Sequence, residues 1–87
     1  MTFLYIIYSR NKNRYYTGIT DDLEDRLYRH INSGSKSTKS ASDWVLVYKE
    51  EYSNRSEALK RENQIKKMKS RKYIERLIVE EDNRKEG

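Results

Sequence analysis

The chain has 87 residues, a formal net charge of +5 and no cysteine. A domain of this length buries only about 60 to 65% of the surface of its unfolded chain, and without cysteine neither a disulfide framework nor a thiolate zinc site can stabilise it. The apolar run at residues 3–8 is too short for a signal peptide or a membrane span. We therefore expect one small cytoplasmic domain that depends on packed secondary structure.

Two strands are predicted at the start of the chain. Residues 3–8 are continuously apolar or aromatic, which is typical of a strand buried on both faces. The polar residues 9–14 indicate a hairpin loop, and residues 14–19 a second strand. A connection of about six residues is too short for a parallel crossover, so the two strands should pair antiparallel.

A helix is predicted next. Asp21 and Glu24 have the spacing of a capping box. One apolar face follows at Leu23, Leu27 and Ile31. The helix should end near Gly34, because the polar residues 33–43 have almost nothing to bury and indicate a mobile loop.

A third strand and two further helices complete the chain. Residues 44–52 carry bulky and β-branched side chains suited to a strand. Asn54 and Glu57 repeat the capping spacing and open a basic helix to about Lys69, and Ser70 can cap a last helix. The order β-β-α-β-α-α predicts an α+β fold in which helices flank a small three-stranded antiparallel sheet. Residues 1–79 form the domain, and residues 80–87 are expected to be a disordered tail.

Positive charge is concentrated between Lys60 and Arg76, where eight basic residues face two acids. This run fits either a solvated helical face or a surface that binds phosphate groups. In the second case the residues that would contact the phosphate groups, those of a nucleic acid if the family resemblance described below holds, are Lys60, Arg61, Lys66, Lys67, Lys69, Arg71 and Lys72.

Glu62 has an unusual position within this run. It shares a helical stripe with Ala58, Leu59 and Ile65, which places its carboxylate towards the core. Burying an unpaired carboxylate costs several kcal/mol, on the order of the effective penalty for an isolated ion. Glu62 should therefore have a partner, either a salt bridge with Arg26 or a neighbouring lysine, or a metal ion.

Arg26 and His30 lie one turn apart on the first predicted helix, where both could reach a common point above the sheet. The alternative pairs Arg26 with Asp22 and leaves His30 in solvent. Eight tyrosines against one phenylalanine suggest that some phenolic hydroxyls make specific contacts. A Gly-rich phosphate loop, a Ser-His-Asp set and a His-rich metal site are absent from the sequence.

These residues occur in a familiar order. Phe3-Leu4-Tyr5 lies in the first strand and Tyr16-Thr17-Gly18 in the second, followed by Arg26, His30 and Glu62. The arrangement resembles the GIY-YIG nuclease superfamily, especially its short stand-alone bacterial members, over residues 2–78. The first motif lacks its glycine and the second reads Tyr-Thr-Gly, but both tyrosines and the second glycine are retained.

The resemblance implies a metal-dependent endonuclease with one Mg²⁺ or Mn²⁺ ion bound by Glu62. Tyr5 or Tyr16 would take a proton from the attacking water, and Arg26 would hold the scissile phosphate. His30 would be an accessory donor or an alternative base.

The same resemblance implies DNA, rather than RNA, as the nucleic acid that is cut. Branched, damaged or single-stranded forms are the expected substrates, with a role in repair or recombination. Gly18 would allow the backbone to approach the site closely, although it could also be an ordinary turn glycine. The alternative function is a nucleic-acid-binding adaptor whose nuclease activity is weak or lost.

Overall fold

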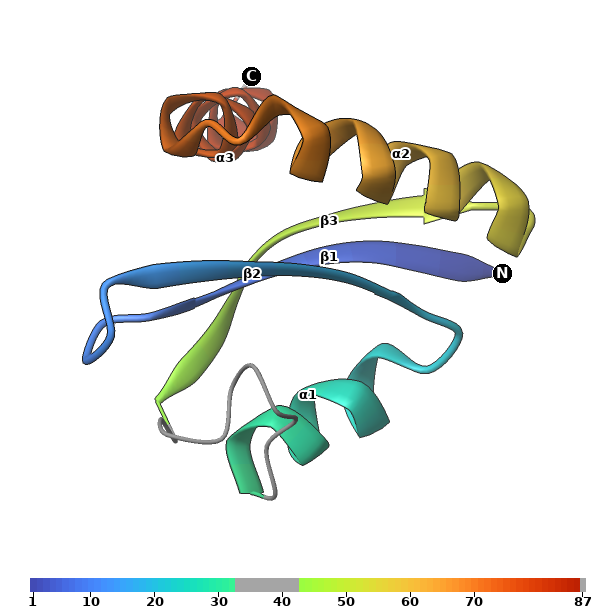
Figure 1. The fold of residues 1–87 in the computed structure, drawn as a ribbon, viewed down its shortest axis with the longest axis horizontal. Helices are drawn as coiled ribbons and strands as arrows, with labels where there is room; N and C mark the ends of the chain where they lie inside the picture. Colours follow the sequence, from blue (N-terminus) through green and yellow to red (C-terminus); the bar gives the residue numbers. More distant parts are fainter. Residues whose placement is uncertain (33–42, 87) are drawn as a thin grey trace.

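The computed structural model describes residues 1–32 and 43–86, which form three strands and three helices (Figure 1). In chain order these are β1 (Thr2–Ser9), β2 (Arg14–Thr20), α1 (Leu23–Asn32), β3 (Trp44–Tyr52), α2 (Arg55–Met68) and α3 (Arg71–Glu86). The predicted element order and the α+β class are confirmed. No helix in this described part of the chain is long and apolar enough to cross a membrane.

β1 is the middle strand of an antiparallel sheet with the order β2-β1-β3. Its central place explains the continuous apolar run in the sequence, because both of its faces are covered. Successive side chains of a strand point to opposite faces. Leu4 and Ile6 therefore join one core cluster, and Tyr5 and Ile7 join another.

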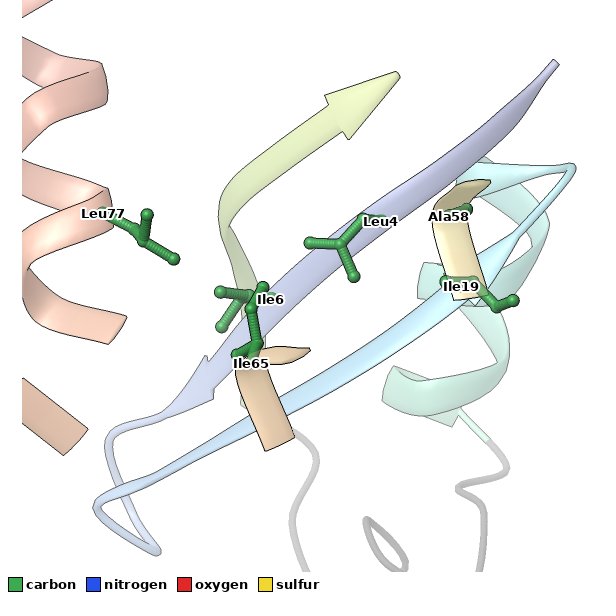
Figure 2. Packing of buried hydrophobic residues seen from close by; sticks show 6 residues of the cluster. All are labelled: Leu4, Ile6, Ile19, Ala58, Ile65 and Leu77. Carbon is green, nitrogen blue, oxygen red and sulfur yellow. The ribbon is translucent and has the colours of Figure 1, made fainter. Parts of the chain in front are cut away.

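Helices cover both faces of the sheet (Figure 1). α2 and α3 lie over one face, and α1 lies over the other. The cluster beneath α2 and α3 consists of Leu4, Ile6, Ile19, Ala58, Ile65 and Leu77 (Figure 2). The cluster on the α1 side is built on Tyr5, Ile7 and Trp44, with Tyr16, Leu23 and Leu27 packed against it.

The N-terminus of α1 differs from the prediction by one residue. The carboxylate of Asp22 accepts a hydrogen bond from the backbone N–H of Asp25 at 3.1 Å, which is an N-cap arrangement. The predicted Asp21–Glu24 box is therefore wrong. Asp21 is engaged elsewhere, since its carboxylate accepts a hydrogen bond from the Thr2 hydroxyl at 2.7 Å.

The buried face of α1 also differs from the predicted one. Leu23 and Leu27 pack towards the sheet, but Ile31 is 41% exposed and His30 is buried instead. Spacings of four and three residues put positions 23, 27 and 30 on one helical face. The predicted helix end at Gly34 and the loop through residue 42 lie outside the described residues.

Side chains cap α2 and α3 as predicted. Asn54 Oδ1 accepts a hydrogen bond from the backbone N–H of Glu57 at 2.9 Å, and Ser70 Oγ accepts one from that of Tyr73 at 3.2 Å. Lys69 ends α2 in the left-handed conformation, with φ of 49°.

α3 is longer than predicted. It runs to Glu86, whereas residues 80–87 were expected to be a disordered tail. The chain has no proline, and this segment has no glycine before Gly87. Its sequence therefore contains no residue that would interrupt a helix.

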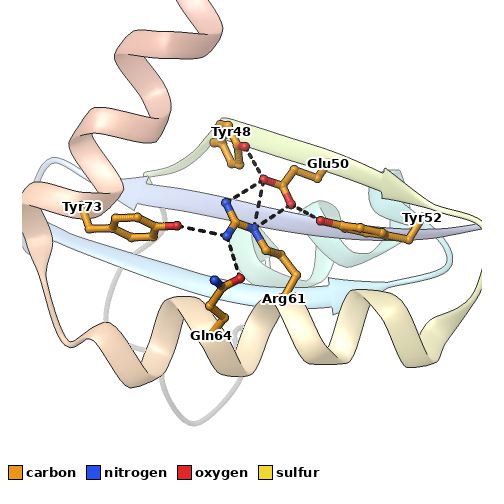
Figure 3. Close-up of polar contacts among 6 residues, drawn as sticks. All are labelled: Tyr48, Glu50, Tyr52, Arg61, Gln64 and Tyr73. Atoms are coloured by element: carbon orange, nitrogen blue, oxygen red, sulfur yellow. Dashed lines mark hydrogen bonds and ion pairs between the residues drawn. The ribbon is translucent and has the colours of Figure 1, made fainter.

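A polar network attaches α2 to β3 (Figure 3). Arg61 forms an ion pair with Glu50 at 3.1 Å, and each side chain is only 18% exposed. The Arg61 guanidinium also donates to the Tyr73 hydroxyl at 3.0 Å, while the hydroxyls of Tyr48 and Tyr52 donate to Glu50. The network holds α2 in one rotation about its own axis. It thereby sets the direction of the Glu62 side chain, which follows Arg61 on the helix.

Candidate active site

Two tyrosines and a histidine meet on the α1 side of the sheet. The Tyr5 hydroxyl shares a hydrogen bond of 2.9 Å with His30 Nε2, and both residues are buried. The Tyr16 ring centroid lies 6.4 Å from that of Tyr5 and 5.1 Å from that of His30. Tyr5 pairs with Gly18, and Ile7 pairs with Tyr16, so the two tyrosines are diagonal neighbours on one face.

Gly18 is required by the packing of Tyr5. A Cβ atom built at position 18 would lie 2.6 Å from the Tyr5 hydroxyl oxygen and 2.8 Å from Cζ. The phenol ring therefore passes directly over the backbone of β2. The close approach inferred from the sequence is made by a side chain of the protein itself.

Burial dominates the electrostatics of Tyr5. It raises the pKa of Tyr5 to about 12, and the neighbouring Tyr16 and Glu62 act in the same direction. The Arg26 guanidinium opposes this increase through its charge and through hydrogen bonding. Arg26 and Glu62 are thus within electrostatic reach of the phenol, which stays protonated at neutral pH.

The surroundings of His30 favour its neutral form. Burial lowers its pKa, and the positive charge of Arg26 lowers it further. The solvent-exposed alternative for His30 is therefore wrong, because the ring is buried against Tyr5. Arg26 and Asp22 are joined by a main-chain hydrogen bond, in which the backbone N–H of Arg26 donates to the carbonyl oxygen of Asp22 at 3.1 Å. This bond is distinct from the side-chain pair of the alternative.

Glu62 projects from α2 with its side chain 14% exposed, and its carboxylate lies 3.2 Å from Lys66 Nζ. The same ammonium group lies 5.9 Å from the centroid of the Tyr16 ring. Lys66 thus connects the Glu62 carboxylate to the aromatic cluster. Of the partners left open by the sequence, the neighbouring lysine is the one observed, and the four-residue spacing was the available signal.

The donor set limits which metal ion could bind here. Within the described residues, no three or more His, Cys, Asp or Glu side chains are grouped so that they could hold a metal. Mg²⁺ commonly keeps several waters and uses one or two carboxylates together with substrate phosphates. The single carboxylate of Glu62 is sufficient to hold such a hydrated ion.

The predicted basic residues separate into three groups. Lys66, Lys69 and Arg71 line a cleft of about 390 Å³ beside β2. Arg61 is committed to Glu50 in the network under α2. The remaining ones are exposed outside this cleft: Lys60, Lys67 and Lys72.

Arg14 and Tyr15 also line the cleft and were not singled out from the sequence. One tyrosine or arginine in a predicted strand does not indicate that its side chain lines a cleft. The cleft forms only when the turn between α2 and α3 packs beside β2.

Several known proteins are similar to this chain in sequence and fold. The chain matches the family described as the GIY-YIG catalytic domain over residues 1–74. It is 39% identical over 79 residues to a UPF0213 protein of Staphylococcus saprophyticus, covering 90% of this chain and 94% of that relative. It is 37% identical over 79 residues to the UPF0213 protein YhbQ of Escherichia coli, covering 90% and 77%. The solution NMR structure of a UPF0213 protein from Bacillus halodurans matches with a TM-score of 0.57 at 28% identity, covering 91% of this chain and 84% of that one.

Proposed function

The protein is a member of the GIY-YIG family, and from this premise we propose that it is a metal-dependent endonuclease that hydrolyses phosphodiester bonds in DNA. Branched, damaged or single-stranded forms are the proposed substrates. The observation that carries the proposal is the meeting of Tyr5, Tyr16 and His30 within 6.4 Å, with Arg26 and Glu62 close enough to perturb Tyr5.

Tyr16, once it has lost its own proton to solvent, is the phenolate that we assign to take a proton from the attacking water. It is partly exposed, whereas Tyr5 is completely buried and holds its proton strongly. A group that takes a proton from water must lie within hydrogen-bond reach of that water. Tyr5 and His30 then act as positioning residues, because their rings fix that of Tyr16.

Arg26 would bind the scissile phosphate and stabilise the charge that develops on its oxygens. Glu62 would hold one hydrated Mg²⁺ or Mn²⁺ ion. Such an ion, when bound, stabilises the negative charge on the leaving oxygen. Lys66 must release the Glu62 carboxylate for this to happen, and an ion pair with a half-exposed lysine costs little to separate.

Cleavage of labelled single-stranded, branched and fully paired oligonucleotides tests the proposal. We expect products with Mg²⁺ or Mn²⁺ and none with EDTA. Glu62→Gln and Tyr16→Phe should each reduce the single-turnover rate by about 10²-fold or more, while DNA binding without metal persists. Undiminished cleavage by Glu62→Gln would remove that residue from the mechanism.

The Lys66–Glu62 ion pair favours a second candidate function. It already satisfies the carboxylate, so the protein could bind nucleic acid without cutting it. This adaptor function predicts salt-sensitive binding of the same oligonucleotides and no metal-dependent product. The cleavage experiment therefore separates the two functions.

A further inference from the structure

A cleft lies beside the candidate active site, between the β2 edge and the turn that joins α2 to α3. Its volume is about 390 Å³, within the range of about 300 to 1,000 Å³ of small-ligand pockets. Tyr16 and Lys66 line it, and the same two residues border the candidate active site. A molecule in the cleft would therefore lie next to the reacting groups.

The lining of the cleft combines apolar and basic side chains. Ile74 and the half-buried ring of Tyr15 give it apolar surface, and the buried Ile65 lies behind them. Its charged lining residues are all basic, and among the described residues no acid lines it. These basic lining residues are Arg14, Lys66, Lys69 and Arg71. Apolar surface with positive charge suits a ligand that has both a flat ring and a phosphate.

The walls of the cleft are held in place before any ligand binds. Arg71 donates to the carbonyl oxygen of Asn13 at 3.0 Å and to Asn13 Oδ1 at 2.7 Å, which ties α3 to the β1–β2 turn. The Arg71 guanidinium carbon also lies 5.1 Å from the centroid of the Tyr15 ring. Such preorganisation lowers the entropy cost of binding.

We propose that this cleft holds one unpaired nucleotide of the strand that is cut, immediately next to the scissile phosphate. The base packs against Tyr15 and Ile74, and its phosphate contacts Lys66 and Lys69. This inference rests on the proposed function and deepens it, since a base can enter the cleft only when it is outside the duplex stack. DNA with unpaired nucleotides is then preferred over fully paired DNA.

Binding without metal tests the inference directly. Two duplexes are compared by fluorescence anisotropy in EDTA, one with a single bulged nucleotide and one with an abasic bulge at the same position. We expect the wild-type protein to bind the base-containing bulge about fivefold or more tightly, the lower end of what one packed base contributes. Equal affinities for the two duplexes would overturn the proposal.

Two matched pairs of variants locate the effect. Ile74→Trp fills the cleft and should bring the affinity ratio close to one, whereas Ile78→Trp, one turn further along α3 and outside the lining, should leave it unchanged. Lys69→Asn should weaken binding of the bulged duplex more than Lys72→Asn, and it keeps the left-handed conformation accessible at position 69. Similar effects from both members of each pair would overturn the assignment to this cleft.

Cleavage of the same duplexes separates this inference from the proposed function. Metal-dependent cutting with equal affinities would refute the nucleotide site alone. A clear preference for the base without cutting would support the site and refute the nuclease. Absence of any binding at low salt would refute both.

Discussion

Tyr5 leaves no room for a side chain at position 18. The modest Gly18→Ala substitution would place a Cβ atom 2.6 Å from the Tyr5 hydroxyl oxygen. Because Tyr5 is completely buried, its ring cannot move without disturbing its neighbours. We expect the free energy of unfolding to fall by about 1 to 3 kcal/mol, the usual cost of overpacking, in urea unfolding followed by circular dichroism.

The double variant Gly18→Ala with Tyr5→Phe is the control for this contact. Removing the hydroxyl relieves the closest approach, although Cζ at 2.8 Å would still crowd the new methyl group. Part of the lost stability should therefore return. If Gly18→Ala costs the same in both backgrounds, the phenol oxygen is not the source of the clash.

In the proposed mechanism, Lys66 competes with the metal ion for Glu62. Their ion pair of 3.2 Å involves a lysine that is 52% exposed, and such a pair is worth at most about 1 kcal/mol. Lys66→Gln should therefore raise the affinity for Mn²⁺ by no more than about fivefold, measured without DNA from the electron paramagnetic resonance of free Mn²⁺.

Lys67→Gln is the matched control, since it removes the same charge from the next residue of α2 without breaking the pair. We expect it to change the Mn²⁺ affinity less than Lys66→Gln does. Equal changes in the two variants would mean that general charge, rather than the contact with Glu62, controls metal binding.

The junction of α2 and β3 depends on Arg61 and Glu50. Arg61→Ala should lower the free energy of unfolding by about 2 to 3 kcal/mol. This loss is somewhat smaller than for a fully buried ion pair, because each of the two side chains is 18% exposed. The exposed pair of Arg29 and Asp25 provides the control. Arg29→Ala should cost less than about 1 kcal/mol, and a similar loss from both variants would contradict the assigned role of the network.

Acid should weaken the same junction. Burial alone would raise the pKa of Glu50, but hydrogen bonds from Tyr48, Tyr52 and Arg61 outweigh it and hold the pKa below its ordinary value of 4.5. The ionised Glu50 carboxylate therefore stabilises the fold above pH 4.5. This stabilisation is lost as the pH falls through the lower pKa that Glu50 has in the folded state. As the pH falls below 4.5, urea unfolding should show a steeper loss of stability for the wild type than for Glu50→Gln.

Local sequence was enough to predict most elements. The caps at Asn54 and Ser70 depend on contacts three residues apart, and these are visible in the sequence. The cap at Asp21 was misassigned because its carboxylate is engaged by Thr2, nineteen residues away. Periodicity likewise could not show that His30 replaces Ile31 on the buried face.

The candidate site was predictable only as a set of residue types. The order of Tyr5, Tyr16, Arg26 and Glu62 indicated a common centre, but not which phenol is exposed or that Lys66 lies between Glu62 and Tyr16. Those facts depend on the register of the sheet and on the rotation of α2. Arg61 shows the same limit, since charge placed it on a binding surface and packing placed it against Glu50.

For the molecule as a whole, the proposed binding to nucleic acid should depend on net charge. The formal charge is +5, and the exposed lysines of α2 and α3 add to the field around the cleft. Affinity for single-stranded DNA should fall with salt, with a log–log slope of about −0.7 for each phosphate contacted. Anisotropy titrations between about 50 and 200 mM salt measure this slope, and Lys72→Gln should reduce its magnitude. A slope near zero would exclude a binding surface made by these charges.

β1 serves both layers of the protein at once. Its odd-numbered side chains, Tyr5 and Ile7, face α1, and its even-numbered ones, Leu4 and Ile6, face α2 and α3. A substitution on either face therefore displaces the backbone that carries the other. Variation that alters substrate range without harming stability should then be tolerated mainly outside this strand, in the turn between α2 and α3 and along the outer surface of α1.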